Sequence, residues 1–180
     1  MSKWTDLSLP TERAALVAFY DLTGFTAFSS KHAPLDVLDI LSGYFTITGE
    51  IISARGGKLI KTLGDAGLCV FLAEDADDGI LALRDVQRVG DRWLATKSYK
   101  ARTKVKVNAG PVAFGMVGAP GSQVFDVYGK TVNVAAVLES HTFAMTAAAF
   151  RSLSAGTRKL FKKHTPPVSY IALEDSHAAS

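Results

Sequence analysis

The segment GGKLIKTLGDAGLCVF (56–71) contains two strand-like runs on either side of a tight turn. KLIKTL (58–63) and GLCVFL (67–72) are apolar and bounded by glycines, as expected of short β-strands. Only Gly64-Asp65-Ala66 separates them, and glycine favours turns. The segment therefore predicts a β-hairpin with Asp65 at its tip.

Further strands are predicted on both sides of this hairpin. ALVAFYDL (15–22) is a short apolar run that ends at a Thr-Gly turn, so we expect a buried strand. TKVKVNAG (103–110) alternates polar and apolar residues, and PVAFGMVG (111–118) is predicted to form a second strand after it. PPVSYIAL (166–173) is predicted to be the last, edge strand, because a sheet edge tolerates proline.

Helices are predicted between the strands, at 25–32, 34–54, 75–97 and 130–139. The helix over 34–54 carries two apolar stripes, so we expect it to be buried on two sides, against the sheet and against a partner chain. Strands in hairpin pairs with intervening helices predict an α+β fold. In this fold, helices cover one face of a mostly antiparallel sheet.

The composition fits one globular domain of a cytoplasmic protein. The chain has 180 residues, of which 48% are hydrophobic and 21% charged. We expect a leader over 1–12, a single domain over 13–175 and a tail over 176–180. We see no apolar run long enough to span a membrane and no secretory signal pattern. The single cysteine, Cys69, lies in an apolar run and is predicted to be a buried structural thiol.

The net charge of +3 is too small to indicate a nucleic-acid-binding protein. Basic residues gather between 84 and 106, but aspartates interrupt them, so we expect a solvated helix face that runs into a strand. The four histidines lack the spacing of metal ligands.

Two aspartates lie at the ends of predicted strands, where a metal site could form. Asp21 ends the strand predicted over 15–22, and Asp65 lies at the hairpin tip. Carboxylates on two adjacent loops can hold Mg²⁺ or Mn²⁺ between them. Free amides at the start of the helix after Gly24 could bind phosphate. Taken singly, however, an aspartate after a strand or at a hairpin tip is usually an ordinary turn or cap residue.

Two common nucleotide-binding motifs are excluded. Gly129-Lys130-Thr131 resembles the end of a P-loop, but Val124 occupies the place of the first glycine. The glycines at 115, 118 and 121 lack the spacing of the dinucleotide-binding fingerprint.

Taken together, three segments closely resemble the catalytic domain of class III adenylate/guanylate cyclases over residues 15–145. The most specific parts are DLTGFT (21–26), KTLGDA (61–66) and FDVYGKTVNVAA (125–136). The resemblance implies a ferredoxin-like α+β fold that works as a homodimer, with two composite active sites in the dimer cleft. It also implies ATP or GTP as the substrate and two divalent metal ions, Mg²⁺ or Mn²⁺, as cofactors.

The resemblance also assigns residues of this chain to roles. Asp21 and Asp65 match the metal-binding aspartates, and Asn133 matches the asparagine that orients the ribose. The phosphate-binding backbone would comprise Leu22, Thr23, Gly24, Phe25 and Thr26. Lys61 and Asp126 match the pair that selects the purine. An ammonium group only donates hydrogen bonds and a carboxylate only accepts them, which suits N1 and the 6-amine of adenine.

The chain departs from the family pattern in two respects. Val137 stands where the family usually has an arginine that neutralises the α-phosphate, and the triphosphate-binding lysine also has no clear counterpart. Loss of one such donor costs on the order of 10²–10³ in rate. Other cations could substitute: Arg151, Arg158, Lys159, Lys162 and Lys163.

Two functions therefore remain open from the sequence. The first is an adenylate cyclase that converts ATP to cyclic AMP and pyrophosphate, slowly because of Val137. The alternative is an inactive cyclase homologue that binds ATP as a sensor or interaction module. A diguanylate cyclase is disfavoured because the chain lacks a GG[DE]EF sequence. We expect no nucleic acid or membrane partner.

Overall fold

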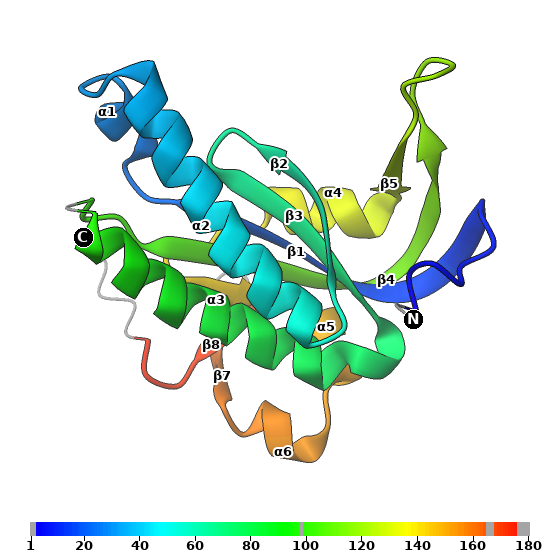
Figure 1. Ribbon diagram of the computed structural model, residues 1–180. Coiled ribbons are helices and arrows are strands. Elements are labelled where there is room, and N and C mark those ends of the chain that lie inside the picture. The colour runs from blue at the N-terminus through cyan, green and yellow to red at the C-terminus, as the bar shows by residue number, and fades with distance from the viewer. Residues whose placement is uncertain (1–2, 98, 165–167, 176–180) are drawn as a thin grey trace.

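The computed structural model describes residues 3–97, 99–164 and 168–175 (Figure 1). The predicted tail over 176–180 and the first two residues of the strand predicted over 166–173 lie outside the described residues. The elements are β1 (Thr11–Leu22), α1 (Phe25–Ser29), α2 (Pro34–Ala54), β2 (Lys58–Leu63), β3 (Ala66–Leu72), a 3₁₀ turn η1 (Ala73–Asp75), α3 (Ala76–Thr96), β4 (Thr103–Val117), β5 (Val124–Tyr128), α4 (Lys130–Val137), β6 (Phe143–Met145), α5 (Ala147–Ser152), α6 (Ala155–Arg158), β7 (Phe161–His164) and β8 (Ser169–Ala172).

The strands form one sheet in the order β2-β3-β1-β4-β6-β8-β7, and β5 pairs with β4 off this path. Within the described part of the chain, β4 and β6 make the one parallel pair and all other pairs are antiparallel. The predicted α+β class, the β2–β3 hairpin and the helix over 34–54 are confirmed.

Helices cover both faces of the sheet, so the prediction that they cover one face was wrong. α2 and α3 lie side by side across one face, and α4 lies behind the sheet (Figure 1). β1 explains this arrangement, because its side chains alternate between two cores. Leu16 and Ala18 join the core under α2 and α3, whereas Ala15 and Val17 join the core under α4.

Residues 103–117 form one strand, β4, not the two that were predicted. Pro111 does not break it, because the carbonyl oxygen of Pro111 accepts a hydrogen bond from Thr131 at 2.7 Å and so points away from β1. The missing N–H lies on that same side, between the stretches of β4 that pair with β6 and with β5. The proline therefore removes no hydrogen bond from the β1–β4 ladder.

The C-terminal edge also differs from the prediction. β8 lies between β6 and β7, and β7 forms the edge of the sheet. β7 comes from the basic stretch RKLFKKH (158–164), in which no strand was predicted. β5 and β6 were not predicted as separate strands. They have five and three residues, too few to show a clear period.

The residues before β1 are part of the fold. β1 begins at Thr11, inside the predicted leader, and the Trp4 side chain is buried. Its indole Nε1 donates to the Gly56 carbonyl oxygen at 2.9 Å, and its ring packs on Phe114 at 5.9 Å between centroids. The described part of the leader is therefore tied to the loop between α2 and β2 and to β4.

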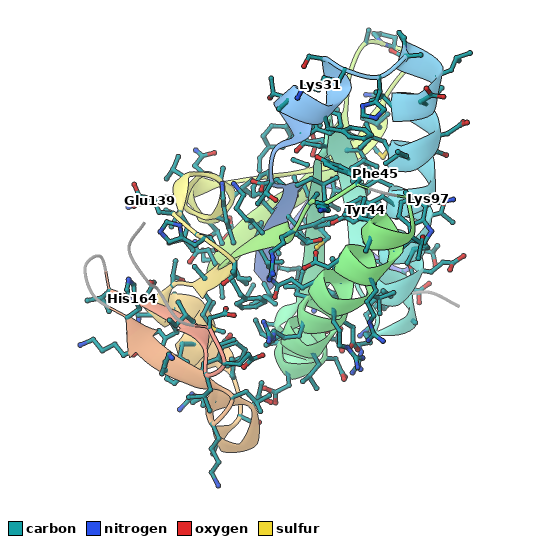
Figure 2. All side chains as sticks on the ribbon, turned by 90° about the vertical axis from the view of Figure 1, so that its left-hand side faces the viewer. Lys31, Tyr44, Phe45, Lys97, Glu139 and His164 are labelled. Carbon is teal, nitrogen blue, oxygen red and sulfur yellow. The ribbon has the colours of Figure 1, made fainter. Side chains whose placement is uncertain are left out.

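α2 is the long apolar helix of this structure. Its 21 residues and mean hydropathy of 1.2 would suffice to cross a membrane, contrary to the sequence prediction. Core helices of globular proteins pass the same test. Tyr44, Thr48 and Ile52 are buried, and Tyr44 and Phe45 point from α2 toward the sheet (Figure 2). Leu35 and Leu38, at the N-terminal end, are exposed.

Two helical glycines allow a direct test of this packing. A β-carbon at Gly79 of α3 would lie 2.7 Å from Cγ of Phe71, whereas one at Gly49 of α2 would meet Leu59 at an ordinary 3.7 Å. We expect Gly79→Ala to lower the free energy of unfolding by about 1–3 kcal/mol through overpacking. Gly49→Ala should raise it by up to about 1 kcal/mol, because alanine favours the helix. Urea denaturation followed by circular dichroism measures both, and equal effects would contradict the close contact of α3 with β3.

Candidate active site

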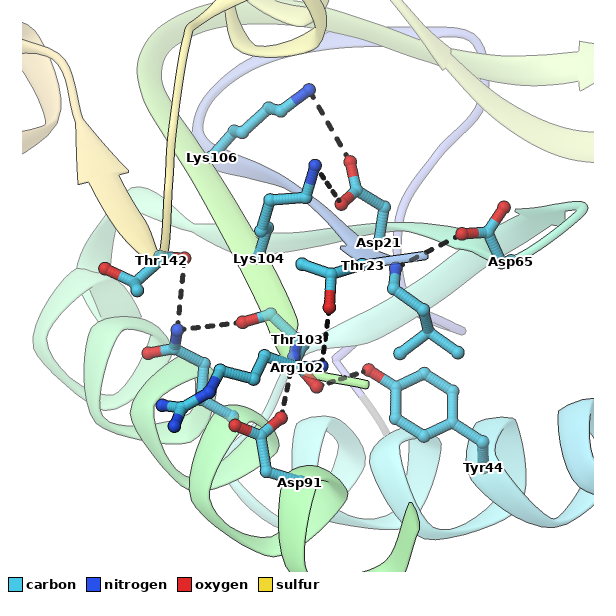
Figure 3. Close-up of polar contacts among 12 residues, drawn as sticks. Asp21, Thr23, Tyr44, Asp65, Asp91, Arg102, Thr103, Lys104, Lys106 and Thr142 are labelled. Atoms are coloured by element: carbon cyan, nitrogen blue, oxygen red, sulfur yellow. Dashed lines mark hydrogen bonds and ion pairs between the residues drawn. The ribbon is translucent and has the colours of Figure 1, made fainter. Parts of the chain in front are cut away.

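The two predicted metal aspartates lie next to each other at one end of the sheet. Asp21 is near the end of β1, and Asp65 lies in the turn between β2 and β3 (Figure 3). The pairing of β1 with β3 brings the turn to this end. The backbone amide of Leu22 then donates a hydrogen bond to Oδ2 of Asp65 at 3.2 Å. Leu22, the residue after Asp21, thus positions the carboxylate of Asp65.

Two lysines from β4 flank Asp21, and the sequence analysis did not place them there. Lys104 Nζ lies 3.4 Å from Oδ1 of Asp21, and Lys106 Nζ lies 3.6 Å from Oδ2 (Figure 3). Lys104 stands directly opposite Asp21 in the β1–β4 register. Both lysines were predicted to belong to a solvated basic face, yet their side chains are only 31% and 22% exposed. The alternation of polar and apolar residues in TKVKV indicates that both lysines lie on the same face of β4. Their position beside Asp21 follows from the register of β4 against β1, which the sequence analysis did not predict.

One carboxylate oxygen of Asp21 accepts no hydrogen bond from the described residues. This oxygen, Oδ1, is buried. The lysine distance of 3.4 Å exceeds the usual 2.7–2.9 Å of a charge-assisted hydrogen bond. Buried carboxylate oxygens normally find a partner. A carboxylate oxygen without a hydrogen-bond donor, near a second carboxylate, suits a hard divalent cation, because such cations prefer oxygen ligands.

The predicted phosphate-binding backbone divides into two parts. The amides of Leu22 and Thr23 already donate hydrogen bonds within the fold. Leu22 donates to Asp65, and Thr23 donates to the carbonyl oxygen of Arg102. The Arg102 amide in turn donates to Oγ1 of Thr23 at 2.8 Å. Gly24, Phe25 and Thr26 show no hydrogen bond from their amides to any described residue. Gly24 has φ 70°, a left-handed conformation that glycine adopts without strain, and it turns the chain into α1.

The predicted purine-selecting residues form an ion pair within one chain. Lys61 Nζ of β2 donates to Oδ2 of Asp126 on β5 at 2.6 Å. The Tyr128 hydroxyl donates to the same oxygen at 2.9 Å, and the Val127 amide donates to Oδ1 at 2.8 Å. The Asp126 side chain is 7% exposed and that of Lys61 is 39% exposed. The sequence had aligned these residues to family positions, and the structure brings them into contact.

These contacts fix the charge of Asp126. Burial alone would raise the pKa of its carboxyl group, but the hydrogen bonds from Lys61, Val127 and Tyr128 lower the pKa below its usual value. The hydrogen bond to Asp126 conversely raises the pKa of the Tyr128 phenol. At neutral pH this position therefore presents an ionised acceptor next to an ammonium donor.

Asn133 and Val137 lie one turn apart on the outer side of α4. Thr131 and Ala135 point inward and are buried, whereas Asn133 is exposed and Val137 is 80% exposed. The side chain of Asn133 contacts neither the aspartates nor the Lys61–Asp126 pair through any hydrogen bond within the described residues.

The other proposed cations do not reach the aspartates. Arg158 donates to the carbonyl oxygens of Phe150 and Arg151, and its guanidinium lies over the Phe150 ring. Lys162 donates to the Leu173 carbonyl oxygen. Among the described residues, Lys104 and Lys106 are the cations that pair with Asp21.

Comparison with known proteins gives consistent results. Residues 9–164 match the family model described as "Adenylate and Guanylate cyclase catalytic domain". The chain is 31% identical over 134 residues to the germination-specific adenylate cyclase of Dictyostelium discoideum, covering 70% of this chain and 16% of that protein. It is 30% identical over 135 residues to the receptor-type guanylate cyclase gcy-23 of Caenorhabditis elegans, covering 70% of this chain and 12% of that protein. The chain thus spans less than a fifth of the length of these relatives.

The fold agrees with solved structures. The crystal structure of the adenylyl cyclase CyaB from P. aeruginosa superposes with a TM-score of 0.79 at 16% identity, covering 96% of this chain and all of that one. At this identity the likeness concerns the fold alone, and it agrees with the α+β architecture predicted from the sequence.

Proposed function

Because the chain belongs to the adenylate and guanylate cyclase catalytic domain family, we propose that it is an adenylate cyclase that acts as a homodimer. The observation that carries the choice of ATP is the Lys61–Asp126 pair at 2.6 Å. An ammonium group has three donors, so Lys61 can keep Asp126 and still donate to N1 of adenine. A carboxylate offers about four acceptor sites, so Asp126 retains one for the 6-amine. Guanine presents the reverse pattern at both atoms.

The proposed reaction is an intramolecular substitution at phosphorus. The ribose 3′-oxygen bonds to the α-phosphorus, the bond from that phosphorus to the oxygen bridging the β-phosphate breaks, and the hydroxyl proton passes to water. ATP thus gives cyclic AMP and pyrophosphate. The Asn133 amide would orient the ribose, and the amides of Gly24, Phe25 and Thr26 would hold phosphate oxygens.

Asp21 and Asp65 would hold two divalent ions, Mg²⁺ or Mn²⁺. Oδ1 of Asp21, which accepts no hydrogen bond from the described residues, and the nearby carboxylate of Asp65 suit such ions. When bound, these ions would lower the pKa of the 3′-hydroxyl and balance charge on the pyrophosphate. The hydrogen bond from Leu22 keeps the Asp65 carboxylate turned toward β1.

The homodimer would complete the site. In the proposed arrangement, one chain supplies Asp21 and Asp65 and its partner supplies Lys61, Asp126 and Asn133. The β4–β5 hairpin projects from the sheet (Figure 1) and exposes apolar side chains, namely Met116, Val117, Val124 and Tyr128. Exposed apolar surface of this kind supports association with a second chain. We further propose a cytoplasmic protein without nucleic acid or membrane partners.

Val137 supports a second candidate, an inactive homologue that binds ATP as a sensor or interaction module. Its exposed isopropyl group offers neither a charge nor a hydrogen bond to a phosphate. Against this candidate stand the Asp65 carboxylate, which accepts a hydrogen bond from the residue after Asp21, and the Lys61–Asp126 ion pair.

Product analysis separates the two candidates. Purified protein with ATP and Mn²⁺ should form cyclic AMP and pyrophosphate in equal amounts, as measured by chromatography and a coupled pyrophosphate assay. Binding of ATP without either product would overturn the cyclase activity and establish the binding module. Product from GTP at the same rate would overturn the choice of ATP.

A double substitution tests the purine selectors. Lys61→Glu with Asp126→Asn places an acceptor and an amide donor where guanine needs them, so we expect the ATP/GTP ratio of kcat/KM to fall about 10- to 50-fold. Lys61→Glu alone should lose both substrates, because two carboxylates would then meet. Lys61→Met is the matched control: it should weaken ATP use without gaining GTP. A ratio that stays constant in all three variants would contradict the role of the pair.

A further inference from the structure

Thr23 marks the point where the chain leaves the β1–β4 ladder. The last pair of that ladder is Leu22 opposite Thr103. One residue further, the Thr23 amide donates to the Arg102 carbonyl oxygen at 2.9 Å, and the Arg102 amide donates at 2.8 Å to Oγ1 of Thr23 (Figure 3). The threonine hydroxyl thus takes the place that a backbone carbonyl would hold in the ladder. The chain can therefore turn away at Gly24, whose φ is 70°.

Tyr99 binds the backbone carbonyl that this arrangement leaves over. Its hydroxyl donates to the Thr23 carbonyl oxygen at 3.2 Å. Its buried ring stacks on Phe28 of α1, with centroids 4.0 Å apart and ring planes at 18°. Burial, and then the charge of Asp65, raises the pKa of the Tyr99 phenol to about 12, so the hydroxyl stays protonated at neutral pH. Tyr99 therefore holds both ends of the turn, through Thr23 and through Phe28.

Residues 99–102 form a fixed support because the next residue, Thr103, is anchored to two helices. The Thr103 amide donates to Oδ1 of Asp91 at 2.6 Å, and its carbonyl oxygen accepts from Nε2 of Gln87 at 2.9 Å, both on α3. Its hydroxyl shares a hydrogen bond of 3.0 Å with the hydroxyl of Tyr44 on α2. α2 and α3 therefore hold this support in place.

We infer that Thr23 and Tyr99 are positioning residues for the loop Gly24–Thr26. The inference rests on the proposed function, which assigns this loop to phosphate. The amides of the loop donate to no described residue, and α1, with five residues, is too short to be stable by itself. The support therefore keeps these amides in one arrangement before phosphate binds, which reduces the ordering cost of binding.

Thr23→Val tests the inference, because it removes the Oγ1 acceptor and keeps the shape of the side chain. At saturating Mn²⁺, we expect pyrophosphate to bind about tenfold more weakly, as measured by calorimetry. KM for ATP should rise by a similar factor while kcat stays within about threefold, because the loop would bind phosphate equally in the ground state and the transition state. Thr23→Ser restores the acceptor and should return both values to within about twofold of the unaltered protein. Tyr99→Phe keeps the ring stack and should weaken pyrophosphate binding about three- to tenfold.

Tyr44→Phe is the matched control. It removes a buried hydrogen bond from Thr103, whose backbone keeps its bonds to α3. We expect a lower midpoint of thermal unfolding but no change in pyrophosphate affinity or in KM. A merely structural role for Thr23 would give Thr23→Val this same pattern, because loss of folded protein lowers the apparent kcat and leaves the affinity of the folded fraction unchanged.

The results separate the inference from the proposed function. If the unaltered protein binds pyrophosphate and both Thr23→Val and Tyr99→Phe match it, the inference is wrong and the proposed function stands. The inference is also wrong if Thr23→Ser fails to restore the affinity that Thr23→Val loses. If the unaltered protein binds no pyrophosphate at saturating Mn²⁺, the proposed function itself fails. If Thr23→Val does not fold, as judged by circular dichroism, Tyr99→Phe carries the test.

Discussion

Asp65→Asn should lower the rate of cyclic AMP formation at least about 10³-fold while leaving the protein folded, because loss of one metal-binding carboxylate removes several kcal/mol of transition-state stabilisation. The amide oxygen of asparagine can still accept the hydrogen bond that Leu22 N donates to Oδ2 at 3.2 Å. The substitution thus removes the charge and keeps the local contact. Initial rates with ATP at saturating Mn²⁺ measure the effect.

Asp39→Asn is the matched control for this experiment. Asp39 is exposed on α2 and makes no ion pair with another described residue, so its substitution should leave the rate unchanged. Thermal unfolding should show similar stability for both variants. A rate within tenfold of the unaltered protein in Asp65→Asn would contradict a metal role for this aspartate and remove the main support for two-metal chemistry.

The strongly patterned parts of the fold were predictable from the sequence. The β2–β3 hairpin and α2 follow from local signals, namely a glycine turn between apolar runs and an apolar period after Pro34. β4 was wrongly divided at Pro111, because a proline interrupts a strand only where its N–H would join the ladder. That condition depends on the strand neighbours, which local sequence does not contain.

The candidate site was predictable only where family motifs covered it. Asp21, Asp65, Lys61 and Asp126 stand in such motifs. In the structure the Leu22 amide donates a hydrogen bond to Asp65, and Lys61 forms an ion pair with Asp126. Lys104 and Lys106 stand outside those motifs, and their position beside Asp21 depends on the register of β1 against β4.

Val137→Arg should raise the rate of cyclic AMP formation about 10²–10³-fold, the usual worth of one preorganised donor at a phosphoryl transition state. Position 137 lies one turn after Asn133 on the exposed side of α4, and the valine is 80% exposed, so an arginine fits without disturbing the core. Val137→Met, which enlarges the side chain without charge, should give no gain. An unchanged rate in Val137→Arg would contradict the alignment of this position with the family arginine.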